Sequence, residues 1–388
     1  MRIALAYSGG LDTSVILKLM REKLNAEVIT VTVDVGQPED FNSIESKAYR
    51  LGAIKHYNVD AKNEFAENYV YKAVKANALY DGDYPLSTAL ARPLIASKVV
   101  EVALKEGADT VAHGCTGKGN DQIRFDLAIK ALAPHLKIIA PVRDWGLTRD
   151  WEIEYAVKHS IPVKSKVYSI DENLWGRSIE GGVLDDPSVE PPEEVFTWTV
   201  PPSKAPENPD YVEIEFERGV PTAVNGIKMG PVELISYLNH IAGAHGVGRV
   251  DMMENRVIGL KSREVYEVPA ATTIITAHRD LERLVLTKRT LDFKWYVDGE
   301  WAKLVYQGLW FEPLRGALDS FIDSVENVVS GTVRVKLYKG KASVVGRSSP
   351  YSLYDNELMK SLDQSMSVGF IELYGLQAVK AYWGKLKA

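Results

Sequence analysis

The sequence contains a single cysteine, Cys115, among 388 residues. One thiol cannot form an internal disulfide or a Cys-x-x-Cys site, so both are excluded and a reducing compartment is indicated. Long apolar runs are also missing. The first one breaks at Ser8-Gly9-Gly10, and none approaches the roughly 20 residues that span a bilayer. We therefore expect a soluble cytoplasmic protein without a signal peptide or membrane partner.

Positive charge is not in excess either. The 46 Lys and Arg residues are set against 52 Asp and Glu residues, for a net charge of −6, which gives no reason to expect a nucleic-acid partner. His240 and His245 lack the Glu-flanked helical spacing of a zinc site, and the other histidines are scattered. The sequence therefore predicts no metal site formed by histidines. Hydrophobic residues make up 46% of the chain, as in globular proteins long enough for two domains.

Two common phosphate-loop patterns are absent, yet the N-terminal segment has the features of a phosphate site. Gly117-Lys118 is followed by glycine, and no Gly-x-Gly-x-x-Gly follows the first strand. Residues 2–7 predict a strand, 8–10 a tight turn and 15–20 a helix. The free N–H groups and the dipole of a helix start attract anions, and glycines let the backbone approach them. Hydroxyl groups of Ser8, Thr13 and Ser14 surround the same point.

Asp12 is the unusual residue of this loop, because a carboxylate repels a phosphate unless a cation lies between them. Two interpretations stay open: Asp12 helps to hold Mg²⁺ carried by a nucleotide, or it caps the helix. The Ser-Gly-Gly-x-Asp-Ser/Thr pattern resembles the pyrophosphatase loop of enzymes that split ATP between its α and β phosphates. A tight turn without a ligand is the alternative.

The first half of the chain alternates strands and helices. Strands are predicted near 28–33, 54–59, 110–112 and 137–141, and helices near 41–51, 65–78, 92–107 and 148–159. A further helix follows the loop that ends at Asp121 and holds Arg124, Leu127, Ala128 and Leu132. The helix at 92–107 is expected to open at Arg92-Pro93. This alternation is typical of a doubly wound α/β domain with a parallel sheet, whose ligands lie beyond the carboxyl ends of the strands. Glycine loops follow two of these strands, at 8–14 and 114–121, and we expect both to face one crevice.

The second half has a different pattern. Seven prolines between 185 and 209 argue against regular structure there. Residues 211–217 alternate strictly, as in a half-buried antiparallel strand. Helices are predicted at about 231–244, 270–289 and 313–328, and strands near 332–338, 342–345 and 369–374. Leu376, Val379, Tyr382, Trp383 and Leu386 form an apolar stripe on a terminal helix, which either docks on its own domain or, as we favour slightly, packs on another subunit.

The second glycine loop is rich in functional groups. Gly114-Cys115-Thr116-Gly117-Lys118-Gly119-Asn120-Asp121 precedes a helix, and Arg124 shares a helix face with Asn120. A planar amide beside a guanidinium suits a carboxylate or a ureido group. A polar capping loop is the alternative, and His113 and Cys115 are interpreted as structural residues.

Taken together, these motifs resemble the argininosuccinate synthase family over nearly the whole chain. The resemblance rests on segments 6–14 and 114–124, Asp171-Glu172-Asn173-Leu174, Gly246-Val247-Gly248-Arg249, and 254–256 through Tyr266-Glu267. It implies an α/β fold with a nucleotide-binding domain at 1–165, an α+β synthetase domain at 166–364, and a C-terminal strand and oligomerisation helix at 365–388. It also implies a ligase of arginine biosynthesis that joins citrulline and aspartate through a citrullyl-AMP intermediate, releasing AMP and pyrophosphate.

The resemblance also implies which residues bind each substrate, and a homotetramer. No protein nucleophile or acid/base group is implied. ATP, with Mg²⁺, would meet Ala6, Tyr7, Ser8, Gly9, Gly10, Leu11, Asp12, Thr13, Ser14, Val33 and Gly114. Aspartate would meet Thr116, Asn120 and Asp121. Citrulline would meet Tyr84, Asn120, Arg124, Ser169, Ser178, Glu254 and Tyr266.

One position departs from the family. Many members carry a serine five residues after the tyrosine that corresponds to Tyr84, where this chain has Ala89. A backbone group or Thr88 would have to supply that citrulline contact. A tRNA-modifying enzyme and a nucleotide sensor are rival interpretations of the first loop, but the first would need a basic patch or a cysteine pair, and the second leaves the second loop unexplained.

Overall fold

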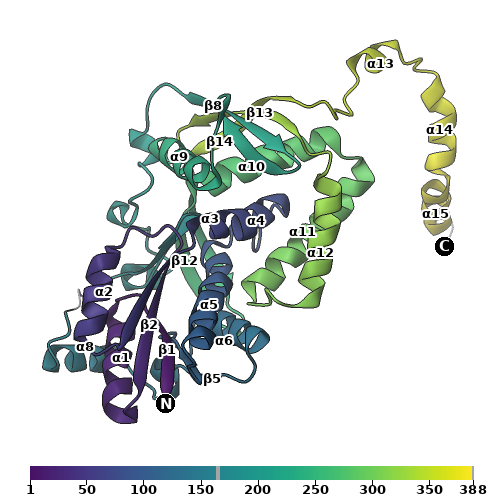
Figure 1. Ribbon diagram of the computed structural model, residues 1–388. Helices are drawn as coiled ribbons and strands as arrows, with labels where there is room; N and C mark the ends of the chain where they lie inside the picture. Colours follow the sequence, from purple (N-terminus) through teal and green to yellow (C-terminus); the bar gives the residue numbers. More distant parts are fainter. Residues whose placement is uncertain (163–166, 387–388) are drawn as a thin grey trace. The chain divides into compact units, whose positions relative to one another are not determined.

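The computed structural model describes residues 1–162 and 167–386. Its contacts divide the chain into a large unit, Met1–Tyr351, and a small unit that begins at Ser352. Figure 1 shows the two main layers of the large unit, a sheet flanked by helices near the N-terminus and a second group of strands packed on helices. Within the described residues, no helix is both long and apolar enough to cross a membrane.

A parallel sheet of five strands in the order β3-β2-β1-β4-β5 forms the first layer. Its strands are β1 (Arg2–Ala6), β2 (Glu27–Asp34), β3 (Lys55–Asp60), β4 (Thr110–Ala112) and β5 (Lys137–Ile139). Its helices are α1 (Leu11–Leu24), α2 (Phe41–Arg50), α3 (Lys62–Phe65), α4 (Tyr71–Lys75), α5 (Ser87–Lys105), α6 (Asp121–Leu132), α7 (Pro141–Asp144) and α8 (Arg149–Lys158). The order reverses between β1 and β4, and ligands bind at such a switch point in doubly wound folds.

Helices cover both faces of this sheet because both faces are apolar. Ile3 and Leu5 pack with α1, α2, α7 and α8 on one side, whereas Ala4 and Ile29 pack with α5 and α6 on the other. Residues 28–33 of β2 are all buried, as their β-branched run predicts. The predicted doubly wound α/β architecture is thus confirmed.

Two helices differ from the sequence prediction. Helix α5 begins at Ser87, after Leu86 with a positive φ of 64°, so Pro93 lies inside it and does not open it. Pro93 removes one intrahelical hydrogen bond, and the burial of most side chains of α5, among them Leu90 and Leu94, offsets that cost. The predicted helix at 65–78 contains a π-helical turn, Ala66–Val70, between α3 and α4.

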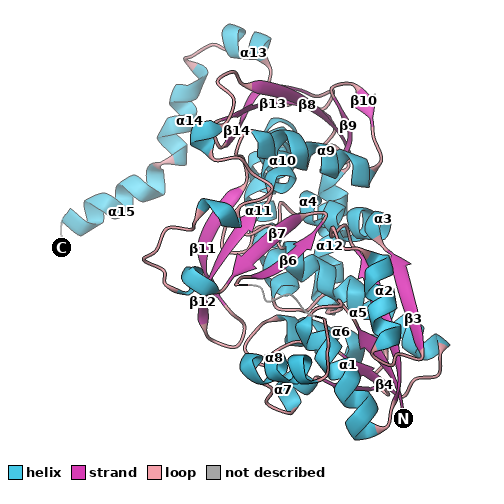
Figure 2. Ribbon diagram, turned by 90° about the vertical axis from the view of Figure 1, so that its left-hand side faces the viewer, coloured by secondary structure: helices cyan, strands magenta, loops and turns pink. Residues whose placement is uncertain are grey.

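Two antiparallel sheets make up the rest of the large unit. One has the order β11-β12-β7-β6 and the other β10-β9-β8-β13-β14, and Figure 2 shows the first lying between the other two sheets. The strands are β6 (Ser169–Asn173), β7 (Gly176–Glu180), β8 (Asp210–Glu217), β9 (Val220–Val224), β10 (Ile227–Lys228), β11 (Arg249–Asn255), β12 (Lys261–Glu267), β13 (Gly331–Tyr338) and β14 (Lys341–Ser348). The helices are α9 (Pro231–Ala244), α10 (Pro269–Val285), α11 (Lys288–Tyr306) and α12 (Pro313–Glu326), with 3₁₀ turns at Gly182–Asp185, Glu193–Val195 and Pro202–Lys204.

The β6–β7 hairpin and helix α11 were not predicted. In this hairpin only Leu174 and Trp175 connect the two strands, because Asn173 pairs with Gly176. The helix predicted at 270–289 corresponds to α10 and ends earlier, at Val285. Helix α11 begins at Lys288, because Thr287 is extended and its hydroxyl accepts a hydrogen bond from the Thr290 N–H at 3.3 Å, which caps the new helix.

The small unit contains three helices, α13 (Asn356–Ser361), α14 (Met366–Tyr374) and α15 (Leu376–Leu386). The strand predicted at 369–374 is wrong, since these residues belong to α14. A strand needs a partner strand for its backbone hydrogen bonds, and no strand forms among the described residues of this unit, whereas a helix satisfies its own. The apolar stripe of α15 is exposed, with Trp383 58% accessible.

Candidate active site

A large cavity of about 1420 Å³ opens beyond the carboxyl ends of β1 and β4. One wall is formed by the two glycine loops, and the opposite wall by one face of the β11-β12-β7-β6 sheet. Of the residues predicted to bind substrates, Ser14 alone does not line it. Those that do are Ala6, Tyr7, Ser8, Gly9, Gly10, Leu11, Asp12, Thr13, Val33, Tyr84, Gly114, Thr116, Asn120, Asp121, Arg124, Ser169, Ser178, Glu254 and Tyr266. The prediction that both loops face one crevice is confirmed, because β1 and β4 are neighbours.

The first loop presents an open helix terminus to the cavity. Gly9 has a φ of +71°, and a Cβ there would lie 3.0 Å from Ile44 Cγ1, so this turn requires glycine. Helix α1 has Gly10 as its N-cap and no side-chain capping bond. Ser8 Oγ lies 3.2 Å from Thr13 Oγ1. The first-turn N–H groups are thus left for an anionic ligand.

Lys47 of α2 is a cation beside this loop that sequence reasoning missed. Its Nζ donates a hydrogen bond to the Gly9 carbonyl at 2.6 Å, and it lines the cavity together with Arg50. Burial, and next the charge of Arg50, lowers the pKa of Lys47. A signal was present in the sequence: Lys47 follows Ile44 by three residues and precedes Leu51 by four, so a lysine stands on the apolar stripe of this helix.

Helix α8 brings further charge to the first loop. Arg149 Nη1 lies 3.0 Å from Asp12 Oδ1. Asp12 is not the helix cap, since Gly10 holds that position. Burial raises the pKa of Asp12, and burial together with the charge of Asp12 raises the pKa of Glu152 to about 7. Oε1 of Glu152 is buried without a hydrogen-bond partner. Carboxylate oxygens of this kind are the ligands that Mg²⁺ prefers, so these residues fit that ion.

The second loop is tied to the first and to α5. A Cβ on Gly114 would lie 3.1 Å from Thr13 Cγ2. Arg92 bridges Asp121 and Asp171, with N–O distances of 2.7 Å to each. The pKa of Asp121 lies below its usual value. Burial alone would raise this pKa, but the positive charges of Arg92 and Arg124 have the larger combined effect. Asp121 therefore stays ionised within the cavity wall.

Arg124 does not project freely into the cavity as a carboxylate fork. Its Nη1 lies 2.8 Å from Asp121 Oδ1, and its Nε and Nη2 donate to the Tyr306 carbonyl at 3.1 and 2.9 Å. The guanidinium is thus held in one orientation at the cavity wall, where the N–H groups that these bonds leave over are available to a ligand.

Tyrosine hydroxyl groups surround Glu254 on the opposite wall. Tyr266 Oη donates to Glu254 Oε1, and Tyr306 Oη donates to Glu254 Oε2 at 2.6 Å. Tyr84 stacks on Tyr266 with ring centroids 4.2 Å apart. Burial raises the pKa of Glu254, against the hydrogen bond from Tyr306 and the charge of Arg124.

Ser169 and Ser178 belong to the same wall. Ser178 pairs with Tyr266 across β7 and β12, and with Asp171 across β6 and β7. Ala89, the position at which the sequence differs from the expected family pattern, does not line the cavity, whereas Thr88 does. The Thr88 N–H also donates to the Tyr84 hydroxyl at 3.0 Å. Thr88, and not Ala89, therefore borders the cavity.

Comparison with known proteins tests the family expected from the sequence. The family model "Arginosuccinate synthase N-terminal HUP domain" matches residues 2–162, and "Arginosuccinate synthase C-terminal domain" matches residues 168–381. The chain belongs to the argininosuccinate synthase family. The argininosuccinate synthase of Pyrococcus furiosus is 66% identical over 98% of this chain and 94% of its own length.

Other members of the family are nearly as similar. The argininosuccinate synthase of Pyrobaculum aerophilum is 60% identical over 98% of both chains, and that of Methanocaldococcus jannaschii is 58% identical over 97% of both. Among solved structures, a predicted subunit of tRNA methyltransferase from Methanocaldococcus jannaschii is 15% identical, with a TM-score of 0.29 over 44% of this chain and 79% of that one. A likeness this slight carries no argument.

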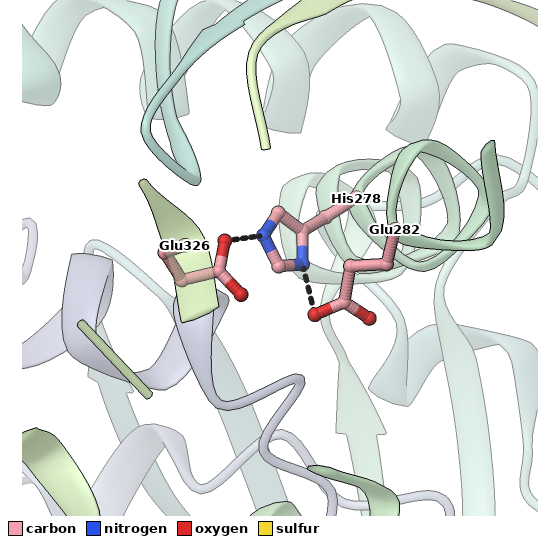
Figure 3. A group of neighbouring side chains, drawn as sticks. All are labelled: His278, Glu282 and Glu326. Carbon is pink, nitrogen blue, oxygen red and sulfur yellow. Dashed lines mark hydrogen bonds and ion pairs between the residues drawn. The ribbon is translucent and has the colours of Figure 1, made fainter. Parts of the chain in front are cut away.

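A second group of titratable side chains lies outside the cavity. Figure 3 shows His278 between Glu282 and Glu326, a set of residue types that could ligate a metal. However, Lys294 Nζ lies 2.7 Å from Glu282 Oε1 and 3.4 Å from Glu326 Oε1. Because the ammonium group already supplies the cation, we assign this group a structural role.

Proposed function

We propose that this cavity is the active site of an ATP-dependent ligase that joins citrulline to aspartate, as the family membership implies. One observation supports it most strongly: an open helix terminus suited to phosphate and a wall suited to amino-acid groups share a single cavity.

The first loop would hold the β and γ phosphates of ATP. Backbone N–H groups at the start of α1 and the hydroxyl groups of Ser8 and Thr13 are donors for phosphate oxygens. Lys47 and Arg50 would neutralise charge on the leaving pyrophosphate. Asp12, with Glu152, would hold Mg²⁺, and that ion would supply further neutralisation of phosphate charge when bound.

The opposite wall would hold the two amino acids. Glu254 is suited to the α-ammonium group of citrulline and Arg124 to its carboxylate. Tyr84, Ser169 and Ser178 lie on the same side of the cavity. Thr116, Asn120 and Asp121 of the second loop would hold aspartate.

The expected chemistry proceeds in two steps without a protein nucleophile. The ureido oxygen of citrulline bonds to the α-phosphorus of ATP as the bond to pyrophosphate breaks; the aspartate amine then bonds to the ureido carbon as AMP leaves. Cys115 is half-buried, and burial raises the pKa of its thiol, so it offers no thiolate. Catalysis here would come from positioning two substrates and stabilising charge.

Pyrophosphate release from ATP with Mg²⁺ tests this function, with citrulline and aspartate added singly and together. We expect sustained release only with both amino acids, with AMP and argininosuccinate formed in equal amounts. Pyrophosphate release that does not require both amino acids would still support an ATP site, but it would contradict the assignment of citrulline and aspartate as substrates.

The roles of the domains, the oligomeric state and the cellular location are also proposals. We propose that residues 1–165 bind nucleotide, that 166–364 complete the substrate site, and that 365–388 join subunits of a homotetramer. The exposed apolar side chains of α14 and α15 support the last of these. A cytoplasmic location is proposed on the single cysteine and the family's biosynthetic role.

A further inference from the structure

Tyr306 is the last residue of α11. It does not line the cavity itself but contacts three residues that do, Glu254, Asn120 and Arg124. No motif of the sequence marks it. Its hydroxyl group donates to Glu254 Oε2 at 2.6 Å and accepts from Asn120 Nδ2 at 2.9 Å. Its ring lies on that of Tyr80, with centroids 3.5 Å apart and an interplanar angle of 3°. The side chain is 1% exposed, so both hydroxyl contacts are shielded from water.

The main chain of Tyr306 holds a third candidate binding residue. Its carbonyl oxygen accepts two hydrogen bonds from Arg124, and the guanidinium lies 5.1 Å from the centre of the tyrosine ring. One residue thus fixes a carboxylate of β11 and the amide and guanidinium at the start of α6, two segments that are far apart in the chain. Groups held by such a support need less reordering when a ligand binds.

We propose that Tyr306 is a positioning residue for citrulline, whose hydroxyl group orients Glu254 and Asn120 and keeps Glu254 ready to accept an ammonium group. This inference rests on the proposed function. The chemistry is direct: a hydroxyl donor stabilises the ionised form of the carboxylate and fixes the direction of its remaining lone pairs. The Asn120 amide is fixed at both ends, because its Oδ1 accepts from the Val257 N–H at 3.0 Å.

The Glu254 carboxylate has several charged or titratable neighbours, and Tyr306 is one of few that a conservative substitution can remove. Burial raises the pKa of Glu254, and the Tyr306 hydrogen bond is the largest opposing effect. The groups that face it from the surrounding elements are Tyr306 of α11, Arg124 of α6, Glu180 of β7, Tyr266 and Glu264 of β12, Arg256 after β11, and Tyr80 and Tyr84 of the loop before α5.

Tyr306→Phe tests the proposal, because it removes the hydroxyl group and keeps the stacked ring and the main-chain carbonyl. We expect the KM for citrulline to rise about tenfold, while kcat and the KM for ATP stay within about twofold, as for the loss of one hydrogen bond to a charged group. The acid limb of kcat/KM for citrulline should also move to higher pH. Without the donor, the Glu254 carboxylate is protonated more easily in the free enzyme.

Tyr71→Phe is the matched control. It removes a tyrosine hydroxyl group that donates to the Pro221 carbonyl at 3.2 Å, away from the cavity, and should change neither the citrulline KM nor the pH profile. An unchanged KM and acid limb in Tyr306→Phe would overturn the proposal. So would a rise in all three KM values together with a lower unfolding temperature, which indicates a general structural role. A wild-type chain that releases no pyrophosphate with citrulline and aspartate would instead remove the proposed function, and this inference with it.

Discussion

At the scale of single residues, the proposed site combines groups that are neighbours in the sequence with groups that are far apart in it. Asp12, Asn120 and Arg124 belong to contiguous motifs, so their chemistry was visible without a structure. Lys47 and Tyr306 act through contacts distant in sequence, and Tyr306 follows Asn120 by 186 positions. The spacing of residues within a motif gives no information about contacts between distant segments. A single lysine or tyrosine on a helix is also common and does not indicate a functional site.

Lys47→Met should raise the KM for ATP by about tenfold or more, because a charge-assisted contact to phosphate contributes roughly 1.5–3 kcal/mol. The KM for citrulline should change little. Steady-state kinetics checks this, with the exposed Lys130→Met as the control for loss of one positive charge. Equal ATP kinetics in the two variants would show that Lys47 does not meet the nucleotide.

At the scale of elements, regular periodicity predicted most of the parallel-sheet half correctly. The antiparallel sheet that forms the substrate wall was harder to predict from the sequence. Exposed and buried residues do not alternate regularly along its strands β6, β7 and β12, and several of their residues are charged. Helix α11 was overlooked for a similar reason. It carries buried Lys294 and Asp298, which pattern reasoning treats as surface residues although a partner can bury them.

The buried charges of α11 fix its position against its neighbours. Lys294 Nζ contacts Asp298 at 2.9 Å, Glu282 of α10 at 2.7 Å, and the Lys75 carbonyl of α4 at 2.6 Å. Asn77 bridges His278 and Glu282 within the same group. The helix that ends at Tyr306 is thus anchored by this group, far along the chain from the substrates' loops.

Lys294→Met should destabilise the fold by about 3–5 kcal/mol, because it leaves buried carboxylates without their cation. The loss should be smaller at acid pH, since those carboxylates then take up protons. Chemical denaturation at pH 5 and pH 8 measures both effects. Lys288→Met, which removes an exposed ion pair with Asp292 on the same helix, should cost no more than about 1 kcal/mol. A similar small loss in both variants would contradict the role given to Lys294.

At the scale of the whole molecule, the small unit that begins at Ser352 stands out because its apolar side chains are exposed in the single chain. Its helices α14 and α15 expose large apolar side chains, among them Phe370, Leu373 and Trp383. Surfaces of this kind mark contacts with other chains. Helical spacing predicted the α15 stripe, whereas the secondary structure of 369–374 depended on whether a partner strand existed.

A double substitution in the full chain, Val379→Glu with Trp383→Glu, should convert the proposed tetramer into smaller species, because two charges would have to be buried at the subunit contact. Light scattering with size-exclusion chromatography measures the mass. Gln377→Glu adds charge on the same helix outside the stripe and should leave the mass unchanged. A tetramer that survives the double substitution would place the contact elsewhere.

The long sequence separation within the cavity also matters while the chain is being synthesised. The phosphate loop emerges from the ribosome first, and domains begin to fold in that order. Glu254, Tyr266 and Tyr306 emerge much later, so a nascent chain carries a nucleotide loop but lacks the wall that would hold citrulline. ATP captured by such a chain meets no acceptor for its α-phosphorus. With the proposed residue roles, only chains whose translation has passed the end of α11 would consume ATP.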